Sequence, residues 1–174
     1  MLDTITALVS SSVAAGLIAT LVMIFFQYLP LLWGGRYFDV LGAIGSWQTK
    51  VLDARARFIG ALVYTGGGIL FALLYGVLVL GVRLNNEFLY GPFVFQLPGS
   101  PIEVNLVYPI LGIAVGLGHG VVVALFTTVL VTRHPLETFH TRLILIISQL
   151  IGHVAFGVVV MFFQSKFLQM MLPI

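Results

Sequence analysis

Hydrophobic positions in this chain form long uninterrupted blocks, separated by short polar segments. Four apolar runs cover about residues 4–33, 58–82, 104–131 and 143–163. A helix needs about 20 apolar residues to cross roughly 30 Å of hydrocarbon, and each run is long enough. Because lipid offers no partner for backbone N–H and C=O groups, each run must be helical. The pattern predicts an all-α, integral membrane four-helix up-down bundle, with residues 1–174 forming a single transmembrane domain.

The polar segments between the runs predict an orientation. Basic residues concentrate in the first and third loops, at Arg36, Lys50, Arg55, Arg57, Arg133 and Arg142. The opposite side carries only Arg83 and Lys166. Short cytoplasmic loops are enriched in Lys and Arg. We therefore expect both termini to lie outside, in the periplasm if the membrane is a bacterial inner membrane.

Two of the loops are more apolar than plain linkers. Residues 37–47 are too short to span, and Asp39 can cap a helix there, which predicts a short interfacial helix on the cytoplasmic face. Residues 83–103 combine turn-forming Gly-Pro and Pro-Gly pairs with several Phe residues. We expect this second loop to fold back on the bundle or to meet a partner.

Composition supports a membrane location and narrows the partners. Hydrophobic residues make up 60% of the chain and charged residues only 8%, whereas a soluble domain carries about 25% charged residues. The lipid bilayer is therefore the first predicted partner. The net charge of +2 comes from loop residues that set orientation, so we predict no nucleic-acid partner. The absence of cysteine excludes disulfides, thiolate metal sites and iron–sulfur clusters.

Small residues recur at four-residue spacing within the runs. Such faces let helix backbones approach closely, which drives association inside lipid. They predict packing within the bundle and, for some faces, packing against other membrane subunits. The predicted helix-packing positions are Gly68, Ala72, Gly76, Gly112, Gly116, Gly120, Ser148 and Gly152.

Two histidines lie near the middle of the last two runs. His119 and His153 should reach similar depth, because helices joined by a short loop run antiparallel as neighbours. Intramembrane ionisable residues are candidates for function. Imidazole is a common axial ligand of haem iron, so a haem b or chlorophyll site using one or both histidines is one interpretation. A hydrogen bond to Tyr64, Ser148 or Gln149 is the structural interpretation, and a proton path or ligand pocket is a third.

No motif predicts catalysis or a resident metal. None of the acidic residues lies inside a run, which disfavours a proton pump or a cation-coupled transporter. In the third loop, His134, Glu137 and His140 include a Glu-x-x-His spacing, which occurs in di-iron bundles. A second such motif is missing, so we expect a solvated cytoplasmic turn.

Several short motifs are spread along the chain, and together they resemble a group of small bacterial four-helix membrane proteins of unassigned activity. The motifs are residues 14–20 (AAGLIAT), 39–42 (DVLG), 118–120 (GHG), 134–135 (HP) and 152–157 (GHVAFG). The resemblance implies a four-helix membrane fold and no particular activity. The apolar second loop looks like an extension beyond that pattern.

Three functional hypotheses follow from the sequence. The first is a non-catalytic accessory subunit of a larger membrane complex, respiratory or photosynthetic, which explains the tiny extramembrane parts and the many small-residue faces. The second is a haem- or chlorophyll-binding protein that uses His119 and His153. The third is a small oligomeric channel or transporter.

Overall fold

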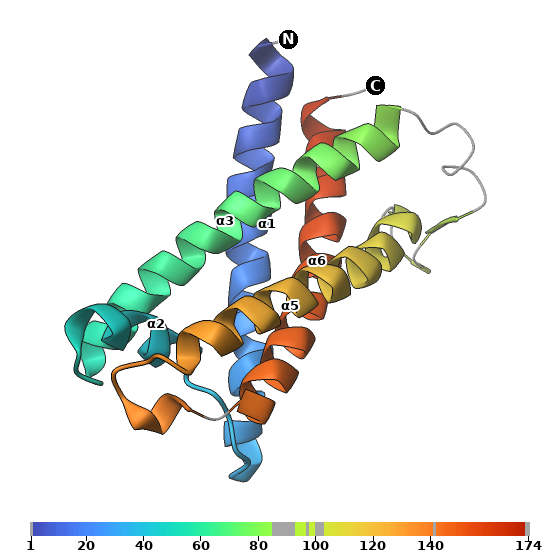
Figure 1. Cartoon of the computed structure of the whole chain (residues 1–174). Coiled ribbons are helices and arrows are strands. Elements are labelled where there is room, and N and C mark those ends of the chain that lie inside the picture. The colour runs from blue at the N-terminus through green and yellow to red at the C-terminus, as the bar shows by residue number, and fades with distance from the viewer. Residues whose placement is uncertain (1, 85–92, 97, 100–102, 141, 173–174) are drawn as a thin grey trace.

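The computed structural model describes residues 2–84, 93–96, 98–99, 103–140 and 142–172. It confirms an all-α bundle of four long apolar helices with a short helix between the first two spans (Figure 1). The long helices are α1 (Leu2–Tyr28), α3 (Ala54–Leu84), α5 (Val107–Val131) and α6 (Arg142–Met171). The short elements are η1 (Leu29–Trp33), α2 (Val40–Thr49), β1 (Val94–Gln96), β2 (Glu103–Asn105) and η2 (Glu137–Phe139).

The four long helices do not all pack on their sequence neighbours. Helix α1 packs against α6 and α3, and α5 packs along α6. Helices α3 and α5 follow each other through the second loop, yet within the described residues they make no extensive contact. Figure 1 shows them as two diagonal helices lying apart in front of α1 and α6. The bundle is therefore closed on three sides and open between α3 and α5.

The ends of the helices follow from local chemistry. Helix α1 ends at Tyr28, and the chain continues as the 3-10 turn η1 because Pro30 cannot extend an α-helix. Helix α5 begins at Val107, slightly later than predicted, because residues 103–105 pair as β2 with β1. In this hairpin Phe95 lies opposite Val104, which is buried. Pro98 and Gly99 form a turn, with Gly99 at a φ of 74°, as predicted for the Pro-Gly pair, whereas residues 85–92, 97 and 100–102, including the predicted Gly-Pro turn at 91–92, lie outside the described residues.

The short helix α2 is confirmed, and it packs closely against α3. Its N-cap is Asp39, whose carboxylate accepts a hydrogen bond from the Gly42 N–H at 2.8 Å. The same carboxylate accepts from the Tyr28 hydroxyl at 2.5 Å and from Arg57 Nε at 2.9 Å. One capping residue therefore joins α2 to the ends of both α1 and α3.

Glycines at the contact between α2 and α3 let the two helix backbones approach each other very closely. A Cβ built on Gly45 would overlap the carbonyl oxygen of Ala56, and one on Gly60 would overlap that of Leu41. Only glycine fits at these two positions. The sequence predicted an interfacial helix but not its close packing against α3.

The most extensive helix contact, between α5 and α6, also depends on glycines that let the backbones touch. A Cβ on Gly112 would overlap the backbone of Gly157, and one on Gly116 would overlap the carbonyl of His153. Both glycines of α5 are buried. Direct backbone contact of this kind stabilises helix pairs in lipid, where no hydrophobic effect acts between helices.

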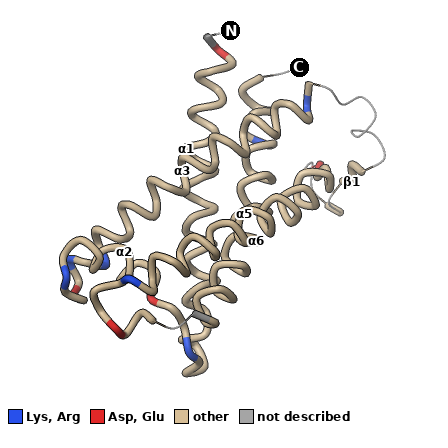
Figure 2. Tube along the Cα trace, in the orientation of Figure 1, with Lys and Arg blue, Asp and Glu red and all other residues tan. Residues whose placement is uncertain are grey.

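Length, hydropathy and charge together define an integral membrane protein. The four candidate spans are Asp3–Trp33, Ala54–Leu84, Val107–Val131 and Leu143–Met171, and their outer faces are apolar. Figure 2 shows the charged residues at the two ends of the bundle, with most of the basic ones around α2 and the loop between α5 and α6. Lys166 and Arg83 lie at the other end, where their side chains donate to the carbonyls of Glu103 and Leu172.

Candidate functional site

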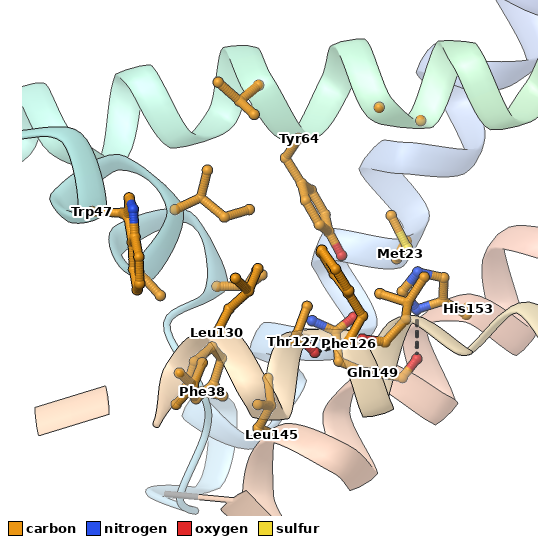
Figure 3. Close-up of a pocket in the computed structure, with 18 of the residues that line it drawn as sticks. Met23, Phe38, Trp47, Tyr64, Phe126, Thr127, Leu130, Leu145, Gln149 and His153 are labelled. Atoms are coloured by element: carbon orange, nitrogen blue, oxygen red, sulfur yellow. Dashed lines mark hydrogen bonds between the residues drawn. The ribbon is translucent and has the colours of Figure 1, made fainter. Parts of the chain in front are cut away.

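A cavity of about 610 Å³ lies between α3 and α5, where the bundle is open (Figure 3). Helices α3 and α5 form its two sides, α2 covers one end, and α1 and α6 form its floor. This volume falls within the roughly 300–1,000 Å³ of typical small-molecule sites. The walls are dominated by aromatic and aliphatic side chains, among them Phe38, Trp47, Phe71, Phe126 and Phe156.

Polar side chains lie among the apolar lining, and none of them is an acid or a strong base. They are Gln48, Tyr64, His119, Thr127, His134, Gln149 and His153. No Asp, Glu, Lys or Arg lines the cavity in the described part of the chain. A charged group in such a site would lack a counter-ion within the low-dielectric interior, which is costly. The lining therefore favours an uncharged occupant.

A hydrogen-bonded group on α1, α3 and α6 fixes the floor of the cavity. The Gln27 amide donates to the Tyr64 hydroxyl at 2.8 Å, and that hydroxyl donates back to Gln27 Oε1 at 3.0 Å. The same amide nitrogen lies 3.4 Å from Gln149 Oε1. These contacts hold three helices together at the depth where Tyr64 and Gln149 face the cavity (Figure 3).

His153 lies on the floor and has a defined tautomer. Its Nδ1 is 2.7 Å from the Gln149 carbonyl, one turn earlier in α6, as Figure 3 shows with a dashed line. A carbonyl can only accept, so Nδ1 carries the proton and the neutral ring presents an unprotonated Nε2. Nε2 makes no hydrogen bond to any described residue, and it is not among the enclosed atoms. It is therefore an acceptor that a molecule in the cavity can reach.

His119 has no such partner within the described residues. Both of its ring nitrogens are buried and without a hydrogen bond. The ring lies against Phe71, with centroids 3.9 Å apart, and meets the edge of the His153 ring at 4.7 Å. An imidazole left unpaired in a membrane protein interior costs free energy. Among the described residues His119 shares this lack of a partner with the buried hydroxyls of Tyr75 and Ser148.

The hydrogen bonds expected of the two histidines are not formed. The structural interpretation assigned them Tyr64, Ser148 or the Gln149 side chain on a neighbouring helix. Instead, Tyr64 pairs with Gln27, the Ser148 hydroxyl has no described partner, and His153 bonds to a main-chain carbonyl of its own helix. Side chains on a helix point back over the preceding turn, which places the Gln149 carbonyl within reach of His153.

The contact between the two rings limits what they can ligate together. Two axial ligands of one haem or chlorophyll stand on opposite faces of a flat macrocycle. His119 and His153 touch edge to face at 4.7 Å, which leaves no space for a macrocycle between them. No cluster of three or more potential metal ligands is found among the described residues. This geometry gives no support to the two histidines acting as a shared ligand pair.

His134, expected to lie in a solvated turn, is in fact buried with an exposed fraction of 6%. Its Nδ1 accepts from the Leu136 N–H at 3.0 Å, so Nε2 carries the proton and donates to the Ala43 carbonyl at 3.0 Å. This bond ties the third loop to α2. The solvated-turn prediction was therefore wrong for His134, because the third loop packs against α2 at this residue.

The remaining predicted packing glycines and Ala72 lie at contacts of α3 with α1 and α6, of α6 with α1, and of α5 with α6. A Cβ on Gly68 would overlap the Thr20 side chain, and Ala72 lies against Gly16. Gly76 leaves room for the Gln164 amide, which donates to Ser12 at 2.7 Å. Gly152 of α6 borders Gln27 of α1, and Gly120 of α5 borders the Cβ of His153 on α6.

Several residues at the site were not singled out from the sequence. Gln27 is a polar residue inside an apolar run, and that signal alone marks it as a candidate. Phe71, Trp47 and Phe126 carry no sequence signal, because aromatic residues are common in membrane helices and at interfaces. Their role depends on where α3 and α5 separate.

Comparison with protein-family models, with curated proteins and with solved structures finds no match to this chain.

Proposed function

We propose that this membrane protein binds an uncharged lipophilic small molecule, which enters the cavity between α3 and α5 sideways from the bilayer. The observation that carries the proposal is the cavity itself, which combines apolar walls with the unpaired Nε2 of His153 at its inner end. Apolar pockets with a few convergent polar groups are the usual form of ligand sites. The side between α3 and α5 lies within the candidate spans, so an occupant reaches it through lipid.

The experiment uses two adjacent glycines. Gly67 lines the cavity and Gly66 does not, and a Cβ added to either meets nothing within 4 Å. Gly67→Phe therefore fills the cavity, whereas Gly66→Phe adds the same bulk on the lipid side. The wild type and both variants would be purified in mild detergent from their native membranes, and co-purifying molecules identified by mass spectrometry of organic extracts. A defined neutral molecule present in the wild type and Gly66→Phe, but lost in Gly67→Phe, is expected.

Identical extracts from all three proteins would overturn the proposal. The pair of variants also tests the fold, because both side chains project into open space and both proteins should have similar thermal stability. A loss of bound molecule in Gly67→Phe alone, at unchanged stability, assigns the effect to the cavity.

An accessory role in a larger membrane complex is our second proposal. It is favoured by Gly66 and Gly118, which are exposed on α3 and α5 and would admit another helix against bare backbone. Co-purification in mild detergent tests it. Stable subunits that detach from a Gly118→Leu variant would support it, and a chain that always purifies alone would oppose it.

For the orientation, we propose that α2 and the third loop face the cytoplasm and both termini face outside. The basic residues gathered around α2 support this assignment. Reporter fusions after Lys50 and Thr138 should be cytoplasmic, and a fusion at the C-terminus should be external. A cytoplasmic C-terminal reporter would reverse the assignment.

A further inference from the structure

We infer that the occupant of the cavity carries a hydroxyl group on a planar ring, and that this hydroxyl donates a hydrogen bond to Nε2 of His153. The inference rests on the proposed function, since it assigns the head-group chemistry of the same site. It follows from three properties of the lining: its charge, the direction of its hydrogen-bonding capacity, and its aromatic character.

The first property is the absence of charge. Because no Asp, Glu, Lys or Arg lines the cavity within the described residues, phosphate and ammonium head groups would find no counter-ion. Ordinary phospholipids are therefore poor occupants of the inner end. The group that reaches the histidines must be polar and neutral.

The second property is direction. The Gln149 carbonyl fixes the proton of His153 on Nδ1, so Nε2 offers a lone pair and no hydrogen. The Tyr64 hydroxyl already donates and accepts in its pairing with Gln27, so it does not compete for this role. A ligand that satisfies Nε2 must bring a donor, and a hydroxyl is the smallest neutral donor. An ether or an ester at the same place would leave Nε2 unpaired.

The third property is the shape of the walls near the histidines. Phe71 and Phe156 lie beside His119, with ring centroids 3.9 and 6.4 Å from its ring, and all three residues line the cavity. Aromatic side chains pack favourably against other flat rings by edge and offset contacts. A ring carrying the hydroxyl suits this end, and an apolar tail suits the remaining walls toward α2.

The test uses a reporter that the chain already contains. Of its two tryptophans, Trp47 lines the cavity and Trp33 is exposed on η1, so Trp33→Phe leaves one reporter at the site. The probes are a para-alkylphenol with a bromine at the end of its tail, the methyl ether of that phenol, and an alkyl phosphate with the same tail. Bromine quenches tryptophan fluorescence on contact. Titrations would use the Trp33→Phe protein in nanodiscs, with and without Gly67→Phe.

The phenol should bind about tenfold more tightly than its methyl ether, as expected for one buried hydrogen bond. The phosphate should quench no more than it does in the Gly67→Phe protein. Adding His153→Phe, which keeps a flat ring without an acceptor, should make phenol and ether equal.

The possible outcomes distinguish failure of the hydroxyl inference from failure of the proposed function. Equal binding of phenol and ether, lost in Gly67→Phe, would overturn the hydroxyl inference and leave the cavity as a lipophile site. Preferred binding of the phosphate would overturn the inference of a neutral head group. Quenching that Gly67→Phe does not change would overturn the proposed function itself.

Discussion

Glycine serves opposite purposes in two regions of the molecule: the contact between α5 and α6, and the opening between α3 and α5. Along α5, Gly112 and Gly116 lie so close to α6 that any side chain would overlap its backbone. On α3, Gly67 lines the opening and has no neighbour within 4 Å of a built Cβ. Glycine therefore allows close contact between two helix backbones in the first region and leaves open space beside the helix in the second. A small residue in a membrane helix indicates a helix contact only if a second helix lies opposite it.

Replacing Gly116 by Leu should produce the largest effect. The added side chain would enter the backbone of α6 at His153, so the two helices must separate. We expect a loss of roughly 3 kcal/mol or more in stability, or no folded protein. Gly118→Leu is the matched control, because it lies two residues away on α5 with open space around it. Thermal unfolding in detergent measures both, and equal melting temperatures would remove the distinction drawn between the two regions.

The contact between α2 and α3 should be almost as sensitive to substitution of its glycines. Gly45→Ala adds a single methyl group that overlaps the Ala56 carbonyl, and we expect about 2–3 kcal/mol of destabilisation. Because α2 carries Trp47 at the end of the cavity, its displacement should also shift the tryptophan emission. Gly66→Ala, which meets nothing, should leave both readouts unchanged. An unshifted emission in Gly45→Ala would show that α2 can tolerate a wider spacing.

A smaller effect is expected from two tyrosines on α3. Tyr64→Phe removes the partner of Gln27 and leaves an amide oxygen unpaired, which should cost about 1–2 kcal/mol. Tyr75→Phe removes a buried hydroxyl that has no described hydrogen-bond partner, so it should be neutral or slightly stabilising. Chemical unfolding of the two variants side by side measures the difference. If Tyr75→Phe were the more damaging change, the Tyr75 hydroxyl must have a partner such as a bound water.

The smallest effect on stability should come from His153→Leu. Its one hydrogen bond goes to a main-chain carbonyl within the same helix, so its loss strands no side chain on a neighbour. We expect less than about 1 kcal/mol. A melting temperature close to that of the wild type, combined with altered ligand binding, would show that the histidine serves the cavity. A large loss of stability would instead show that it serves the core.

The spans were predictable from sequence, whereas the cavity was not. Long apolar runs leave only helices as solutions in lipid, and Asp39 followed by an apolar segment indicated α2 before any coordinates. Contact between α5 and α6 followed from their short connection and from Gly112 and Gly116. The separation of α3 from α5 has no local signature, because it depends on how both helices cross α1 and α6. For that reason the sequence drew attention to His119 and His153 but not to Phe71 or Trp47.

The hydrogen bonds between α1 and α6 have a consequence for how the protein is made. The Gln164 amide donates to Ser11 at 3.1 Å and to Ser12 at 2.7 Å, and Gln149 pairs with Gln27. Helix α1 is synthesised before α6, so its polar side chains lack their α6 partners until α6 has been made. Before α6 is present, the Ser11 and Ser12 hydroxyls donate only to the Leu8 carbonyl of their own helix, and Gln27 pairs only with Tyr64 of α3. The last interhelical hydrogen bonds of α1 therefore form only when α6 is inserted beside it.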